Sequence, residues 1–228
     1  MQVYKYRSNY DLDLKLLSRS KIYAPNKHLL NDPFEGIVIS KIFDDYELIK
    51  PYLSPSNYEY RINLVKKLLV QIGYLGIYSL SKTWNNELLW VHYSNSHKGF
   101  CIEYELDDLL LGKTKTVIFP EILEIEYSKK PPIYSLDGMD KIDKKQLLNI
   151  LIGTKSIPWK YEKEVRVLFK DNGEQDINDK AIKSIIFGAH ASDENINKTI
   201  IQMTNKLKYY KIEIADNYKL IRKGLKYS

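Results

Sequence analysis

The sequence predicts one α+β domain over residues 1–228, with a mixed or antiparallel sheet and flanking helices. Its length of 228 residues suits a single domain of ordinary to generous size. A content of 44% hydrophobic and 28% charged residues is typical of a globular chain and excludes a disordered one. Strand-like and helix-like segments follow one another without regular βαβ alternation, which disfavours a doubly wound nucleotide-binding fold.

Local patterns predict the elements of the first half of the chain. The alternating start, residues 3–7, indicates a short strand, and a helix is expected over 11–18 with Asp11 or Asp13 near its N-cap. Apolar residues at helical spacing between Ser56 and Ile72 predict a longer helix, which Gly73 ends. Further expected elements are strands over 21–24, 74–81 and 99–105, a turn-rich loop over 31–36 and a short helix over 86–93.

The second half is predicted in the same way. Residues 114–127 indicate a strand that Pro120 interrupts. Over 128–145 the composition shifts to Lys, Pro, Asp and Gly, which favours a long surface loop or a small insertion. Beyond it we expect a helix over 146–152, strands over 165–169, 181–187, 209–214 and 218–221, a turn over 171–173 and an amphipathic helix over 194–207.

Composition excludes several classes of protein. A single cysteine, Cys101, rules out an internal disulfide framework and a CxxC zinc site, and it suits a reducing cytoplasm. The N-terminal residues lack an apolar signal core, and no apolar run approaches the roughly 20 residues that cross a bilayer. We therefore expect a cytoplasmic protein with no membrane partner. The net charge of +6 permits a polyanionic partner without requiring one, and no GxGxxG, GxxxxGK[ST] or HExxH motif is present.

Polar residues in the turn Asn31-Asp32-Pro33-Phe34-Glu35 have two readings. Asn and Asp before Pro favour a rigid turn, with Phe34 packed in the core. Alternatively, the loop presents Asn31, Asp32 or Glu35 to a ligand.

The serines of Ser79-Leu80-Ser81 lie at the end of an expected buried strand. Strand alternation places both hydroxyls on one face and Leu80 on the other. They either line a site or satisfy a neighbouring loop.

Aromatic and histidine side chains gather in Trp90-Val91-His92-Tyr93 and the adjoining His97-Lys98-Gly99-Phe100. Trp90 and Tyr93 share a helical face, so they can sandwich a ligand ring or pack in the core. His92 is a candidate site residue because its ring nitrogens need partners if it is buried. His92 and His97 are five residues apart with no carboxylate completing a recognised pattern, so no metal site is predicted.

The most informative stretch is Trp-Lys-Tyr-Glu-Lys-Glu-Val-Arg, which ends at Arg166. If it enters a strand, Glu162, Glu164 and Arg166 project to one face, and Val165 and Val167 project to the core. Two close carboxylates raise each other's pKa and an arginine lowers it again, an arrangement that suits a catalytic carboxylate with an orienting neighbour. A solvated strand edge with one Glu–Arg pair is the alternative.

Taken together, these segments resemble an uncharacterised bacterial family of unknown function. The resemblance covers most of the chain, and its motifs are specific. The segments that carry it are Tyr4-Lys5-Tyr6-Arg7, Asn31-Asp32-Pro33-Phe34-Glu35, Trp90-Val91-His92-Tyr93 with His97-Lys98-Gly99-Phe100, and Trp159-Lys160-Tyr161-Glu162-Lys163-Glu164-Val165-Arg166.

The order Arg, Ser-x-Ser, Glu-x-Glu is similar to the signature of the ADP-ribosyltransferase superfamily. That resemblance implies a split sheet and a site for NAD as substrate. It assigns the NAD phosphates to Arg7, the nicotinamide pocket to Ser79 and Ser81, and stabilisation of the oxocarbenium ion to Glu164 beside Glu162. The remaining residues of the predicted site are His92 as a catalytic group, and Tyr93, Trp90, Asn31 and Asp32 as binding groups.

The function implied by this resemblance is cleavage of the nicotinamide–ribose bond of NAD, with transfer of ADP-ribose to a macromolecule or to water. A toxin or a phage-defence effector is a setting that suits such an enzyme. One alternative is a nucleic-acid or protein binding module without catalysis, although the lysines are scattered in pairs and form no stripe. Another is a metal-dependent nuclease with His92 as general base and Mg²⁺ held by oxygen ligands from Asp32, Glu35, Glu103, Glu162 and Glu164.

Overall fold

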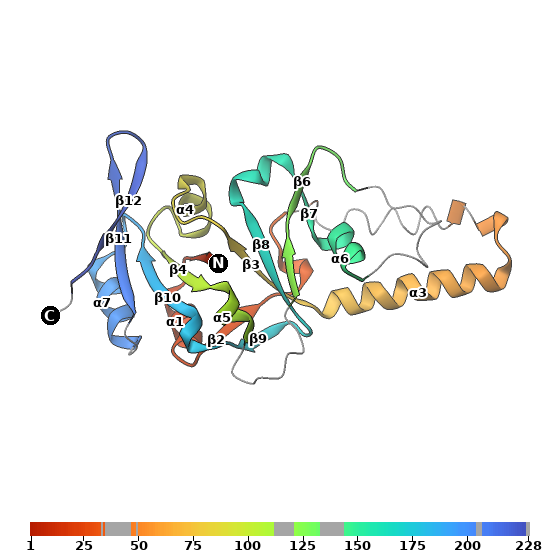
Figure 1. Ribbon diagram of the computed structural model, residues 1–228, viewed down its shortest axis with the longest axis horizontal. Helices are drawn as coiled ribbons and strands as arrows, with labels where there is room; N and C mark the ends of the chain where they lie inside the picture. The colour runs from red at the N-terminus through yellow and green to blue at the C-terminus, as the bar shows by residue number, and fades with distance from the viewer. Residues whose placement is uncertain are drawn as a thin grey trace.

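A computed structural model of the chain describes residues 1–32, 34, 47–48, 50–111, 121–132, 144–203 and 207–226. Within these residues, eight strands form one mostly antiparallel sheet with helices packed against it (Figure 1). The expectation of an α+β fold is therefore confirmed. The part of the chain that the structure describes contains no helix long and apolar enough to cross a membrane.

The sheet has the order β12-β11-β10-β4-β1-β3-β8-β5. Its one parallel pair among the described strands is β10 with β11. Two short pairs, β2 with β9 and β6 with β7, lie outside it. The strands are β1 (Gln2–Arg7), β2 (Lys21–Ala24), β3 (Gly76–Ser81), β4 (Phe100–Glu105), β5 (Glu121–Glu124), β6 (Glu126–Ser128), β7 (Thr154–Ser156), β8 (Glu164–Phe169), β9 (Gly173–Asp176), β10 (Ile182–Phe187), β11 (Lys208–Ala215) and β12 (Lys219–Gly224).

Strands β1 and β3 are joined by little backbone pairing. On its other side β1 pairs with β4 along its whole length, from Gln2↔Glu105 to Arg7↔Phe100. Toward β3 the register holds a single pair, Tyr4↔Ser81. The eight strands thus form a single sheet, and the split sheet that the ADP-ribosyltransferase resemblance implies is not confirmed.

Helices cover both faces of the sheet (Figure 1). One core contains Val3 of β1 together with buried side chains of α1, α5 and α7. On the opposite face, Tyr4 and Tyr6 pack with Leu89 and Trp90 of α4. The helices are α1 (Tyr10–Leu17), α3 (Pro55–Tyr74), α4 (Glu87–Tyr93), α5 (Leu106–Leu111), α6 (Lys144–Ile152) and α7 (Asp193–Gln202).

Two helix boundaries differ from the sequence prediction. Asn9 caps α1 through its side chain, so Asp11 and Asp13 lie in the first turn and not at the cap. Asp13 is buried there and forms an ion pair with Arg7. Helix α7 ends at Gln202, five residues earlier than expected.

The 20-residue helix α3 extends away from the sheet (Figure 1). Ser54 caps its start and Pro55 occupies its first turn, as helix N-termini favour. Near its other end Ile72 packs on buried residues of α6 and of β3 and β8. Of the insertion expected over 128–145, Ser128 ends β6, Lys144 begins α6, and residues 133–143 lie outside the described residues.

A tight turn joins α4 to β4. Asn95, Ser96 and His97 all have left-handed backbone conformations, with φ of 50°, 52° and 65°. Gly99 follows and passes so close to β1 that a Cβ atom there would lie 2.1 Å from the carbonyl oxygen of Arg7. Because no side chain fits, the glycine of His-Lys-Gly-Phe has a structural role.

Candidate functional site

A cavity of about 410 Å³ opens where β1 and β3 diverge. Its walls come from β1, β3, β8 and α4, from the loop after β2, and from Lys155 and Glu162 beside β8. This volume lies in the usual range for small-molecule sites.

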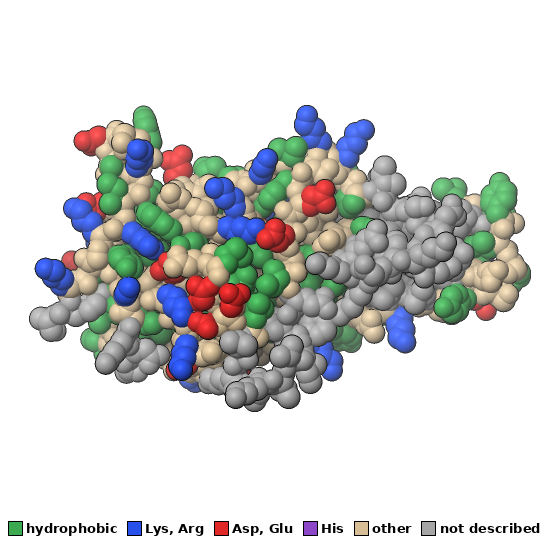
Figure 2. All heavy atoms as spheres, in the orientation of Figure 1, with side chains coloured by type: hydrophobic (Ala, Val, Ile, Leu, Met, Phe, Trp, Pro, Cys, Tyr) green, Lys and Arg blue, Asp and Glu red, His purple; other side chains and the backbone are tan. Residues whose placement is uncertain are grey.

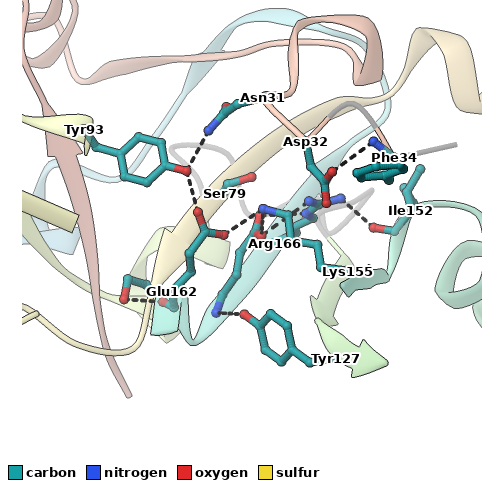
Figure 3. Close-up of polar contacts among 12 residues, drawn as sticks. Asn31, Asp32, Phe34, Ser79, Tyr93, Tyr127, Ile152, Lys155, Glu162 and Arg166 are labelled. Carbon is teal, nitrogen blue, oxygen red and sulfur yellow. Dashed lines mark hydrogen bonds and ion pairs between the residues drawn. The ribbon is translucent and has the colours of Figure 1, made fainter. Parts of the chain in front are cut away.

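Lys155 bridges two buried carboxylates in this cavity (Figure 3). Its Nζ atom lies 2.7 Å from Oε2 of Glu162 and 2.6 Å from Oε2 of Glu164. All three side chains are at most 7% exposed, so the bridge is shielded from water. Burial opposes the charge on Lys155, but Glu164 and Glu162 more than offset it and raise its pKa.

Arg166 holds Glu164 from the other side. Its Nε atom donates to Oε1 of Glu164 at 2.7 Å, and Nη1 donates to the carbonyl of Ile152 at 2.6 Å. Burial favours the neutral acid, yet Arg166 and Lys155 lower the pKa of Glu164 to about 2. Glu164 is therefore ionised at neutral pH. The pKa of Glu164 in the folded protein lies below its usual value. Ionised Glu164 therefore stabilises the fold fully above about pH 4.5, and this contribution is lost as the pH falls toward about 2.

Glu162 has a different environment. Its Oε1 atom accepts a short hydrogen bond from the Tyr93 hydroxyl, which in turn accepts one from Asn31 Nδ2 at 2.6 Å (Figure 3). Burial and Glu162 raise the pKa of Tyr93, which keeps the phenol protonated as a donor. The loop with Asn31, helix α4 with Tyr93 and strand β7 with Lys155 thus meet at the Glu162 carboxylate.

Glu162 is not part of β8, so the strand face considered for Glu162, Glu164 and Arg166 begins only at Glu164. Residues Ile157–Glu162 form a 3-10 helix, and Lys163 follows in a left-handed conformation with φ of 47°. The kink turns the chain between the two glutamates, and both still line the cavity.

The opposite wall carries Arg7. Its Nε atom donates to Oδ1 of the buried Asp13 at 2.6 Å, and Nη2 also contacts that oxygen. Across the sheet, Ser81 lies in register with Glu164, and its hydroxyl donates to the Glu162 carbonyl at 2.7 Å. The serine therefore braces the chain that carries both glutamates.

Eight of the predicted site residues line this one cavity. They are Arg7, Asn31, Ser79, Ser81, His92, Tyr93, Glu162 and Glu164. His92 is exposed at the cavity rim, where its ring lies 6.2 Å from that of Tyr161.

Two predicted binding residues do not line it. Trp90 is fully buried, packs edge-on against Tyr6 at 5.0 Å and stacks on His97, so it is a core residue and offers no face to a ligand. Asp32 is buried beside the cavity lining, and its Oδ1 atom accepts from the Phe34 backbone at 2.9 Å, as in the rigid-turn reading. Phe34 itself is 62% exposed and does not fill the core, and Glu35 lies outside the described residues.

Sequence reasoning missed Lys5, Asp13, Tyr127 and Lys155. Lys5 could have been predicted, because it is two residues from Arg7 in the expected strand and strand alternation places both on one face. Lys155 sits in the short strand β7 with no local pattern to mark it. Tyr127, whose hydroxyl accepts from the Glu164 backbone N–H at 2.8 Å, is equally unmarked.

The described residues contain no group of three or more His, Cys, Asp and Glu side chains able to hold a metal ion. Glu103, proposed as a ligand for the nuclease alternative, instead accepts from Tyr4, Ser184 and Arg222 outside the cavity. On the face drawn in Figure 2, basic side chains lie scattered with acidic ones between them, so the described part of that face carries no basic stripe.

A family model described as "Protein of unknown function (DUF2971)" matches residues 89–167. The expected resemblance to an uncharacterised family is thus confirmed over this stretch, which contains the Trp-Val-His-Tyr, His-Lys-Gly-Phe and Trp-Lys-Tyr-Glu-Lys-Glu-Val-Arg segments but not the two earlier ones. No curated protein and no solved structure matches the chain. The likeness to ADP-ribosyltransferases therefore stays a prediction.

Proposed function

We propose that this chain is an ADP-ribosyltransferase-like enzyme that cleaves the nicotinamide–ribose bond of NAD and passes ADP-ribose to a macromolecule or to water. One observation carries the proposal. Arg7, the serines Ser79 and Ser81, and the pair Glu162 and Glu164 are far apart in sequence, and all line the cavity between β1 and β3.

The cavity offers a carboxylate for the charge that develops on the ribose. When the C1′–N bond breaks, its electron pair goes to the nicotinamide nitrogen and positive charge spreads over C1′ and the ring oxygen. Glu164 is ionised at neutral pH and held on both sides by Lys155 and Arg166, so it needs no reorganisation to stabilise that charge. A carboxylate has more acceptor sites than these contacts use, which leaves room for a ribose hydroxyl.

The opposite wall suits the phosphates. Arg7 engages Asp13 through Nε and Nη2, and within the described chain no residue accepts from its Nη1 atom. A guanidinium fixed in this way presents a preoriented donor to a phosphate oxygen. Tyr93, half-buried in the third wall, offers an aromatic surface to the nicotinamide ring.

The proposed chemistry also bears on the cellular location of the protein and on the acceptor of ADP-ribose. An enzyme that consumes NAD acts where NAD is held, so we infer a cytoplasmic protein. A toxin or phage-defence role is the setting that the resemblance suggests, and the acceptor would be a protein, a nucleic acid or water.

Release of nicotinamide from NAD tests the proposed chemistry. We expect the wild-type protein to release it and Glu164→Gln to do so roughly 100-fold more slowly or worse, because the substitution removes the charge and nearly keeps the shape. Glu103→Gln is the matched control, since it neutralises a buried carboxylate of the same sheet outside the cavity and should keep the wild-type rate. Equal losses in both variants, or no release by the folded wild-type protein, would count against the proposal.

A further inference from the structure

Lys5 occupies an unusual position in the cavity. It lies on β1 immediately after the single pair that joins β1 to β3, and its partly buried side chain lines the cavity. Its Nζ atom donates to the carbonyl oxygen of Ser79 at 2.7 Å and lies 4.9 Å from the centre of the Tyr78 ring. The amine therefore spans the gap where the backbone ladder stops, within reach of any molecule that enters.

The two lysines of the cavity differ in their partners. Lys155 touches two carboxylates at 2.7 and 2.6 Å. Among the described residues, no carboxylate lies within the 4.0 Å ion-pair distance of Lys5 Nζ, which has a neutral carbonyl instead. Paired lysines keep their proton, whereas a lysine that is desolvated without an anion gives it up easily.

The charged groups facing Lys5 come from four elements. Arg7 of β1 and Lys155 of β7 oppose its protonation, while Asp13 of α1 and Glu164 of β8 favour it. Burial is the largest influence, and together with Arg7 it lowers the pKa of Lys5 to about 7. Near neutral pH, an appreciable fraction of the molecules would therefore carry an unprotonated amine here.

We propose that Lys5 is a nucleophilic amine that binds small aldehydes carrying an anionic group, and holds them as an imine. The nitrogen lone pair attacks the carbonyl carbon to give a carbinolamine. One nitrogen proton passes to the oxygen as the carbinolamine forms, the second leaves with the hydroxyl group as water, and a carbon–nitrogen double bond remains. No oxidant or reductant is consumed.

Arg7 explains the preference for an anion. It lies two residues along β1 on the same face as Lys5, roughly 7 Å away, and lines the same cavity. Its Nη1 atom is not engaged by any described residue, so it can receive a phosphate or carboxylate while the aldehyde meets Lys5. This site does not depend on turnover of NAD.

Pyridoxal 5′-phosphate followed by borohydride reduction is a suitable probe, because reduction fixes the imine and peptide mass spectrometry locates it. At about pH 7 we expect Lys5 to be labelled roughly tenfold or more faster than Lys155, with labelling half-maximal near that pH. Pyridoxal, which lacks the phosphate, should label Lys5 more slowly. Arg7→Gln should remove the difference between the two aldehydes.

Lys5→Arg should abolish the fast labelling and leave that of exposed lysines unchanged, with circular dichroism confirming the fold. Lys5→Met serves the same purpose if the arginine cannot be accommodated. Labelling spread over the surface lysines with no preference for Lys5 would overturn the proposal. So would a Lys5 reactivity that rises only above about pH 9, as an ordinary lysine shows. Because neither readout involves NAD, failure here is distinguishable from failure of the proposed enzymatic function.

Discussion

Replacing Arg166 with methionine is expected to lower the free energy of unfolding by about 3–5 kcal/mol, the usual cost of breaking a buried ion pair by removing one partner. Arg166 is 1% exposed and donates to both Glu164 and the Ile152 carbonyl. Methionine fills much of the space but leaves a buried carboxylate short of a cation and a carbonyl short of a donor. For a chain of this size the melting temperature should fall by roughly 6–20 °C.

A surface ion pair of equal length provides the control. Lys82 Nζ lies 2.7 Å from Glu124 Oε1, the same distance as Arg166 Nε from Glu164 Oε1, but Glu124 is 68% exposed. Lys82→Met should cost at most about 1 kcal/mol, because water screens exposed pairs. Urea unfolding measures both variants. Similar small losses in the two would show that the buried network does not hold the site together.

Gly99→Ala is expected to destabilise the fold by about 3 kcal/mol, at the upper end of the usual cost of overpacking. The new Cβ atom would lie 2.1 Å from the Arg7 carbonyl oxygen. The backbone cannot simply move away. The Gly99 N–H donates to the Ser94 carbonyl at 2.7 Å, and its own carbonyl accepts from Gly188 at 2.9 Å. Separation would also pull on Arg7 and so on the cavity wall.

Gly73→Ala is the matched control for this substitution. A Cβ atom at Gly73 meets nothing within 4 Å, and the residue lies in the last turn of α3. Alanine there should be neutral or stabilise by about 0.5–1 kcal/mol, since it loses less entropy in a helix than glycine. Thermal melting of the two variants reports the difference. If Gly99→Ala melted with the wild type, the close approach to β1 would not constrain the fold.

Local patterns were sufficient to predict elements whose apolar residues follow one period. Strand β2 was expected over its observed residues, and β1 and α4 each within one residue at their ends. The periodicity of Ile62, Leu69 and Ile72 likewise predicted most of α3. Strand β9, with the sequence Gly-Glu-Gln-Asp, was missed because it pairs with β2 at the surface and has no apolar alternation.

The candidate site could be predicted only in part. Alternation placed Ser79 and Ser81 on one wall, and the composition of Glu-x-Glu-x-Arg drew attention to Glu164. The contacts that define its electrostatics depend on how the chain folds between the partners. Lys155 reaches Glu164 from β7, and Asn31 reaches Tyr93 across 62 residues, so neither follows from spacing. For Trp90, helical spacing could not distinguish a face that stacks on a ligand from one that packs in the core. In the structure its ring packs against Tyr6 and His97, which makes it a core residue.

These features define a cavity with three chemically distinct walls. One wall holds an ionised carboxylate between two cations, the second presents a guanidinium fixed by Asp13, and the third supplies Tyr93. The sparse junction of β1 and β3 makes room between them. We propose that NAD binds in this space with its phosphates at Arg7.

Calorimetric titration with ADP-ribose tests this placement of the phosphates, because ADP-ribose carries both phosphates and lacks the nicotinamide–ribose bond that would be cleaved. We predict one binding site in the wild-type protein and roughly 10- to 100-fold weaker binding by Arg7→Gln, as expected when a hydrogen bond to a charged group is lost. Arg19→Gln, an exposed arginine outside the cavity, should bind like the wild type. Absence of binding by the folded wild-type protein, or equal affinities in all three, would contradict the assignment of the cavity to NAD.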